Sequence, residues 1–243
     1  MGHPPRTARI QAVVFDLFRT LVDPEGVNPE AYRRIDRLAS HLGIGVAPLQ
    51  EWWRSSREQR LRRRAPRLAE LLGDFCEKQR APRSEATIEA ALSVADAFHD
   101  QALLHPHDHV VRTLKDLRAL GVRIGILSNT DEHEIRLWPK SPLASLADAV
   151  GLSIDTGHVK PEFEAYRWIL DALGGIEPGR AIFIGDGEGH ELRGAKQAGF
   201  GKVFFLREFV AFTAFQAPET LQEIALEADA SLDHLRDILS SLD

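Results

Sequence analysis

Cysteine is almost absent from this chain of 243 residues, in which Cys76 stands alone. An internal disulfide and a metal site built from several cysteines are therefore excluded. No apolar run approaches the length of a membrane span, and residues 1–9 lack the apolar segment of a secretory signal peptide. The formal net charge of −6 disfavours general nucleic-acid binding. We expect a cytoplasmic protein that binds neither nucleic acid nor a membrane.

The composition is otherwise that of an ordinary globular chain, with 44% hydrophobic and 27% charged residues. Its length allows one large domain, or a core with a smaller inserted domain. Residues 24–106 hold 13 basic and 12 acidic side chains, whereas the remainder holds 17 and 24. This difference in charge favours an inserted module. The sequence contains no internal repeat and no signal for an oligomeric state.

The segment from residue 24 to residue 106 has the apolar spacing of helices and no strand-like run. We predict Gly43 as a C-cap and Ser84 as an N-cap. We therefore predict an all-helical domain over residues 24–106, inserted in a core formed by residues 1–23 and 107–243. The predicted helices cover residues 31–42, 47–64, 66–79 and 84–104.

In the core, short apolar runs alternate with helical patterns. Such alternation predicts an α/β fold with a parallel sheet covered by helices on both faces. The predicted strands cover residues 12–15, 122–127, 149–154, 181–184 and 202–206. The predicted helices cover residues 107–120, 132–138, 161–173, 190–198, 219–227 and 232–242, with Pro161 opening the third of them.

Polar side chains follow several of these strands: Asp16, Ser128 with Asn129, Lys160, and Asp186. Taken singly, Asp186 fits a helix cap and Lys160 a surface lysine. Ligands of parallel α/β sheets bind beyond the carboxyl ends of the strands, however. The joint occurrence of these groups at that edge favours a functional site over separate structural roles.

Four short stretches in this order resemble the motifs of the haloacid dehalogenase superfamily. They are residues 16–21 (Asp-Leu-Phe-Arg-Thr-Leu, against the usual Asp-x-Asp-Gly-Thr-Leu), 126–129 (Ile-Leu-Ser-Asn), 160–162 (Lys-Pro-Glu) and 184–187 (Ile-Gly-Asp-Gly). The resemblance implies a Rossmann-like hydrolase. The inserted helical segment matches the position of the C1-type cap of subfamily I.

The resemblance implies that Asp16 is the nucleophile, which forms a covalent ester or acyl phosphate and so divides one difficult step into two. Ser128 would donate a hydrogen bond to a phosphoryl oxygen. Lys160 would offset the crowded carboxylates and hold the substrate. Asn129, next to Ser128, would belong to the substrate-binding residues. The expected ligand is a small anionic molecule.

The family usually employs Mg²⁺, a cation that takes about six oxygen ligands. The resemblance implies that the carboxylates of Asp16 and Asp186 and the backbone carbonyl of Phe18 supply three of them. Water and a substrate oxygen would complete the shell. Glu191, five residues after Asp186, would lie in the outer metal shell, where the family more often has Asp.

Two departures from the motif leave the reaction open. Phe18 replaces the second aspartate, a general acid–base whose loss typically costs about 10²–10⁴ in rate. An aromatic residue here is typical of the family's haloacid dehalogenases, which attack carbon without a metal and bind substrate through a cap arginine, near Arg54 in this chain. Asp186 is instead typical of the phosphatases. Arg19 replaces glycine, either to contact an anionic substrate or the cap, or as an outward-pointing turn residue.

The leading hypothesis is Mg²⁺-dependent hydrolysis of a small phosphorylated metabolite, slowed by Phe18. The alternative is a metal-independent hydrolase acting on carbon, such as a 2-haloacid dehalogenase. A third interpretation is a weakly active or inactive member that binds a ligand or partner. Substrate choice would depend on the cap.

Overall fold

The computed structural model describes residues 10–27, 33–63, 66–210 and 218–242. Its centre is a six-stranded sheet with the order β3-β2-β1-β4-β5-β6, in which every neighbouring pair is parallel. The strands are β1 (Ala12–Phe15), β2 (Arg123–Ser128), β3 (Ala149–Leu152), β4 (Ala181–Gly185), β5 (Lys202–Leu206) and β6 (Ala230–Leu232). The first strand therefore lies in the middle, where Phe15 pairs with residues of both β2 and β4.

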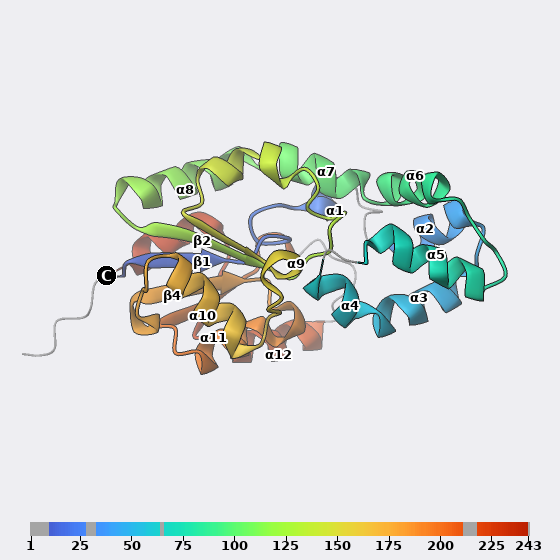
Figure 1. Cartoon of the computed structure of the whole chain (residues 1–243). Coiled ribbons are helices and arrows are strands. Elements are labelled where there is room, and N and C mark those ends of the chain that lie inside the picture. Colours follow the sequence, from blue (N-terminus) through green and yellow to red (C-terminus); the bar gives the residue numbers. More distant parts are fainter. Residues whose placement is uncertain (1–9, 28–32, 64–65, 211–217, 243) are drawn as a thin grey trace, which may run out of the picture.

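Helices cover both faces of this sheet (Figure 1). On one face, Leu114 of α8 (Asp108–Ala119) packs in a cluster with side chains of β1 and β2. On the other face, Ile169 of α10 (Phe163–Ala172) and Leu192 of α11 (Glu191–Gln197) pack in a second cluster. The predicted α/β fold is confirmed. No helix in the described part of the chain is long and apolar enough to span a bilayer.

The helices between residues 24 and 95 gather at one end of the sheet (Figure 1). They are α1 (Pro24–Val27), α2 (Arg34–Leu42), α3 (Val46–Ser55), α4 (Arg57–Arg62), α5 (Leu68–Lys78) and α6 (Glu85–Ala95). Four of them, α2, α3, α5 and α6, share a separate apolar cluster that includes Leu38, Leu72 and Leu92. The following helix α7 (Ala97–Leu104) contributes Leu103 to the cluster on the sheet instead. The domain limits at 24 and 106 stay a prediction.

Local signals located several helix ends correctly. Gly43 follows α2 with a left-handed φ of 62°, and its N–H is bonded to the last turn. The Ser84 hydroxyl accepts a hydrogen bond from the Thr87 N–H, which is N-capping geometry. Pro161 lies before α10 and does not open it, because Glu162 is the N-cap. The predicted helix residues Ala31 and Arg64 lie outside the described residues.

Other helix predictions were wrong. The predicted 47–64 helix is interrupted at Ser56, whose hydroxyl accepts a hydrogen bond from Arg60. The predicted 84–104 helix is interrupted at Asp96, whose carboxylate is drawn into an ionic network. Residues 132–136 form turns, because Asp131 accepts hydrogen bonds from the N–H groups of residues 133 and 134. Residues 232–242 divide between the end of β6 and the 3₁₀ helix η7 (Leu235–Ser241).

The remaining short helices follow the strands or connect them. They are η2 (Trp138–Lys140), η3 (Pro142–Ser145), α9 (Ser153–Thr156), η4 (Pro178–Arg180), η5 (Glu188–His190) and α12 (Pro218–Glu227). The start of α9 ends β3 at Leu152, so the predicted 149–154 strand was two residues too long.

Candidate active site

Asp16 is held at the carboxyl end of the central strand. Its N–H donates to the Ile184 carbonyl of β4 at 2.9 Å, which fixes the backbone against the neighbouring strand. The side chain is buried, with Oδ2 3.4 Å from the Thr20 hydroxyl and Oδ1 bonded to the Lys160 ammonium. Because β1 is flanked by β2 and β4, Asp16 lies between the groups that follow those strands.

Lys160 bridges two buried carboxylates. Its Nζ is bonded to Asp16 and lies 2.5 Å from Glu191 Oε2. Burial opposes the charged ammonium, but the two carboxylates outweigh it and raise the pKa of Lys160. The backbone of Lys160 is clamped by the Asn129 amide, which accepts from its N–H at 2.8 Å and donates to its carbonyl at 2.9 Å. Asn129 therefore positions the lysine, while its predicted contact with substrate stays a prediction.

Three acids form a compact buried group: Asp16, Asp186 and Glu191 each offer an oxygen within 4.8 Å of the others. Burial raises the pKa of Asp186 to about 7, against the pull of Arg19 and with the help of Asp16. Burial likewise raises the pKa of Glu191, although Lys160 opposes this. Asp186 Oδ2 is buried and makes no hydrogen bond in the described part of the chain, although Arg19 lies within ion-pair distance of it. Asp186 and Glu191 therefore hold their protons more readily than free carboxyl groups do.

Glycine is required behind this acidic group. A Cβ on Gly185 would lie 2.0 Å from Glu191 Oε1. That oxygen accepts a hydrogen bond from the Gly187 N–H at 3.0 Å, and Gly187 has a φ of 84°. The two glycines of the 184–187 stretch thus leave room for Glu191 and direct its carboxylate toward Lys160.

Arg19 points at the acids and not outward. Its Nε lies 3.2 Å from Asp186 Oδ2, and its guanidinium is bonded to Glu188. Its φ is 59°, the left-handed region where glycine is usual. The side chain still lines the cavity in front of Asp16, so a contact with substrate remains a prediction.

A cavity of about 410 Å³ opens in front of Asp16. Ser128, at the end of β2, lines it and has no hydrogen-bond partner among the described residues for its hydroxyl. Phe18 also lines the cavity, and its ring packs edge-on against His99 with the centroids 4.9 Å apart. His99 was missed by sequence reasoning, because nothing in the helical pattern of α7 distinguishes it.

The helices α3 and α4 supply the opposite wall of the cavity. Arg54 lines it but is 72% exposed and ion-paired with Glu51. Arg57, one turn later, is half-buried and has neither a hydrogen bond nor an ion pair with any described residue. Arg60 is stacked over Trp53 at 3.9 Å. Arg57 was not singled out from the sequence, because the whole 54–67 stretch is rich in arginine.

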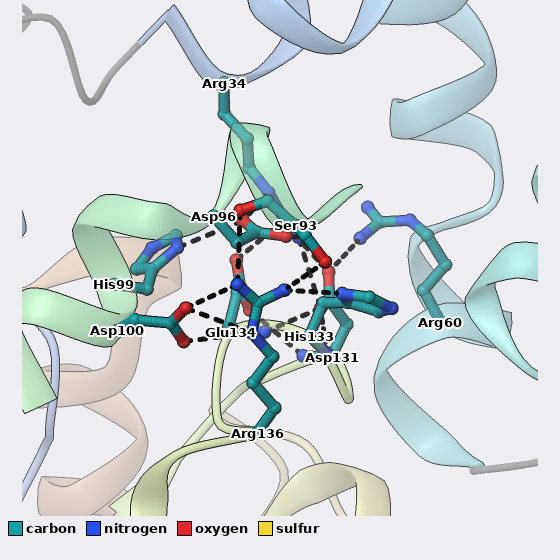
Figure 2. Close-up of polar contacts among 10 residues, drawn as sticks. All are labelled: Arg34, Arg60, Ser93, Asp96, His99, Asp100, Asp131, His133, Glu134 and Arg136. Atoms are coloured by element: carbon teal, nitrogen blue, oxygen red, sulfur yellow. Dashed lines mark hydrogen bonds and ion pairs between the residues drawn. The ribbon is translucent and has the colours of Figure 1, made fainter. Parts of the chain in front are cut away.

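A buried ionic network joins this helical region to the core (Figure 2). Arg34 of α2 contacts Asp96 at 2.5 Å, Asp131 at 2.9 Å and Glu134 at 2.9 Å. Burial opposes the guanidinium charge, but these acids raise the pKa of Arg34. Arg60 also reaches Asp131, at 3.3 Å. The loop after β2 is thereby tied to α2 and α4.

Comparison with known proteins gives the family. The model of the haloacid dehalogenase-like hydrolases matches residues 10–199. The chain is 29% identical over 109 residues to a glyceraldehyde 3-phosphate phosphatase of Methanocaldococcus jannaschii, an alignment that covers 44% of this chain and 46% of the relative. The match spans less than half of that relative's length.

A glyceraldehyde 3-phosphate phosphatase of Methanopyrus kandleri is 28% identical over 198 residues, covering 78% of this chain and 81% of the relative. A solved structure described as a dehalogenase superposes with a TM-score of 0.61 at 19% identity, covering 96% of both chains. That likeness concerns the fold alone. From the match over residues 10–199, the chain belongs to the haloacid dehalogenase-like hydrolases.

Proposed function

We propose that this protein is a Mg²⁺-dependent phosphatase that acts on a small phosphorylated metabolite. The observation that carries the proposal is the buried acidic group of Asp16, Asp186 and Glu191, placed beside Lys160 at a cavity of about 410 Å³. The relatives named as glyceraldehyde 3-phosphate phosphatases support a phosphate ester as the substrate.

The residues present fit a magnesium ion. Carboxylate oxygens are the ligands that Mg²⁺ prefers, and the buried Asp186 Oδ2 makes no hydrogen bond to the described residues beyond its ion pair with Arg19 Nε at 3.2 Å. Asp16, Asp186 and the Phe18 carbonyl would hold the ion, with Glu191 in the outer shell. Bound there, Mg²⁺ would supply positive charge opposite the phosphoryl oxygens.

The chain's own groups supply the nucleophile and part of the charge compensation. Asp16 attacks phosphorus and forms an acyl phosphate, which water then hydrolyses. Lys160 orients the Asp16 carboxylate and offsets its charge through its contact with Oδ1. The Ser128 hydroxyl, which has no partner in the described part of the chain, donates a hydrogen bond to a phosphoryl oxygen, where negative charge accumulates in the transition state.

The part of the substrate that is not transferred would face residues 24–106, which we treat as the cap. Arg57 is a half-buried cation at the cavity with no acidic partner among the described residues. It is therefore better suited than the ion-paired Arg54 to bind a polar or anionic group of the substrate. Given a single cysteine and a small metabolite as substrate, we place the activity in the cytoplasm.

A panel of phosphate esters and 2-haloacids, with Mg²⁺ or with EDTA, tests the proposal. We expect phosphate release that needs both Mg²⁺ and Asp16, and that Asp16→Asn abolishes. Asp148→Asn is the matched control, because Asp148 holds the Ile124 N–H at the opposite edge of the sheet and should leave turnover unchanged. Phosphate release that survives Asp16→Asn would overturn the proposal.

Two observations favour a second candidate, a metal-independent hydrolase of the 2-haloacid dehalogenase type. Phe18 offers no acid–base group, and Arg19 places a fixed cation 3.2 Å from Asp186. Halide release that is insensitive to EDTA would identify this activity. Specific ligand binding without turnover would instead identify a weakly active binding member.

A further inference from the structure

Phe18 leaves this part of the cavity without the acid–base group that the second motif aspartate would supply, and another lining residue can take that role. Under the proposed function, a group must give a proton to the leaving oxygen and later take one from water. A phenyl ring does neither. If the proposed function holds, on which this inference rests, another side chain at the cavity must exchange these protons.

Most of the acids at the cavity are already engaged. Glu134 accepts from Arg34 through Oε1 at 2.9 Å and from the Asp131 N–H through Oε2 at 3.0 Å. Glu188 is bonded to Arg19, and Glu191 to Lys160. These carboxylates hold parts of the site in place. Among the described residues that line the cavity, the imidazole and carboxyl groups left for proton exchange, apart from the nucleophile and Asp186, are those of His99 and Glu25.

His99 is oriented by a carboxylate behind it. Its Nδ1 lies 3.2 Å from Asp96 Oδ1, so this nitrogen donates and the ring cannot rotate freely (Figure 2). Asp96 is fully buried and is itself fixed by Arg34, whose terminal nitrogen donates to Oδ2 at 2.8 Å. Nε2 has no hydrogen-bond partner among the described residues. A histidine held through one nitrogen and free at the other is the arrangement that proton transfer requires.

The ring also stands next to the place of the missing aspartate. Its centroid is 4.9 Å from that of Phe18, two residues after the nucleophile, and both rings line the cavity that Asp16 and Ser128 line. The side chain of His99 is only 10% exposed. An imidazole at this point is largely shielded from bulk water and borders the cavity.

We propose that His99 is the proton-exchanging residue of this enzyme, with Asp96 as its positioning residue. Asp16 forms a bond to phosphorus as the bond from phosphorus to the ester oxygen breaks. The leaving oxygen takes a proton from Nε2 and departs as the alcohol. Water then gives a proton to Nε2 and attacks phosphorus, which releases inorganic phosphate and the Asp16 carboxylate. The ring ends the cycle in its starting state.

Leaving groups of different acidity test this assignment. His99→Asn keeps a donor toward Asp96 but lacks the second nitrogen. With an alkyl phosphate, whose leaving oxygen needs a proton, we expect turnover to fall by about 10²–10⁴. With a nitrophenyl phosphate, whose leaving oxygen needs none, we expect a rapid burst of about one equivalent of nitrophenolate. Slow turnover should follow, because water activation is lost.

Stopped-flow absorbance and trapping of the phosphorylated protein read out this pattern. His133→Gln is the matched control, because His133 has the same 10% side-chain exposure and sits in the same interface, paired with Glu89, but does not line the cavity. We expect the control to behave as the native protein on both substrates. Thermal unfolding of each variant verifies that it is folded.

The outcomes separate the two proposals. If His99→Asn lost the same turnover on both substrates and showed no burst, the role of His99 would be overturned. The same follows if the loss of turnover depends on the leaving group in Glu25→Gln but not in His99→Asn. Glu25 is the informative competitor, because its Oε2 is buried without a hydrogen-bond partner in the described part of the chain. Phosphate release that persists in the Asp16→Asn variant would overturn the proposed function itself.

Discussion

The two walls of the active-site cavity differ in charge. The core wall holds five acids and two cations that neutralise only part of their charge: Asp16, Glu134, Asp186, Glu188 and Glu191 with Arg19 and Lys160. The cap wall holds three arginines and an aromatic ring: Arg54, Arg57 and Arg60 with Trp53. A wall rich in buried carboxylates attracts a cation, and a wall rich in arginine attracts an anion. Under the proposed function, bond breaking belongs to the core wall and substrate recognition to the cap wall.

Removing the buried cation of the core wall should have the largest effect. Lys160→Met leaves Asp16 and Glu191 without their shared partner. We expect a loss of turnover of about 10²–10³-fold, and a loss of unfolding free energy of about 3–5 kcal/mol, typical of breaking a buried ion pair. Lys196→Met removes a half-exposed partner of Asp229 and should change neither quantity. Steady-state kinetics and urea unfolding provide the measurements, and a stable, active Lys160→Met would contradict the ionic account of the core wall.

Separating the two walls should have the next largest effect. Arg34→Met removes the shared partner of three buried or half-buried acids, Asp96, Asp131 and Glu134. Asp131 then keeps only Arg60, and Asp96 only His99, among their ion-pair partners in the described part of the chain. We expect about 3–5 kcal/mol less resistance to urea. Arg37→Met on the same helix is the control, since Arg37 lies outside this network and should cost little. If both variants unfold at the same urea concentration, the network does not stabilise the contact between the walls.

The cap wall is tested by substrate selectivity. Arg57→Gln removes a cation that has no acidic partner among the described residues, and a charge-assisted hydrogen bond is worth about 1.5–3 kcal/mol. We therefore expect kcat/KM to fall about tenfold to a hundredfold for phosphate esters with a second anionic group, and to change little for esters without one. Arg54→Gln, which loses only an exposed pair with Glu51, should leave both classes unaffected. Equal losses of kcat/KM on both classes of ester would show that Arg57 does not distinguish between these substrates.

The same contrast explains what sequence could predict. The groups of the core wall follow strands, and parallel strands bring their carboxyl ends to one edge of the sheet. The sequence alone could therefore place four of them together: Asp16, Ser128, Lys160 and Asp186. The fold class followed from the same alternation of apolar strands and helices.

The cap wall and the network could not be predicted in this way. His99, Arg57 and Arg34 lie on helices whose polar positions all look alike in sequence, and only tertiary packing decides which of them face the cavity. The breaks at Ser56 and Asp96 have the same origin, because side-chain hydrogen bonds there compete with helix continuation. The edge strand β6, only three residues long, is too short for a periodic signal.

Replacing Arg19 of the core wall should have a smaller effect, which is a gain in Mg²⁺ affinity. A cation bound by Asp16 and Asp186 would lie beside its guanidinium, and like charges a few ångströms apart repel by about 1 kcal/mol in water. Arg19→Gly should therefore bind Mg²⁺ severalfold to tenfold more tightly in isothermal titration calorimetry, a measurement that needs no turnover. Arg80→Gly is the matched control, because Arg80 has a similar φ of 56°, against 59° for Arg19, but does not line the cavity. Arg80→Gly relieves the same left-handed backbone strain without altering the charge of the site. Unchanged Mg²⁺ affinity in Arg19→Gly would show that the arginine does not compete with the metal, whereas equal gains in both variants would assign the effect to the backbone.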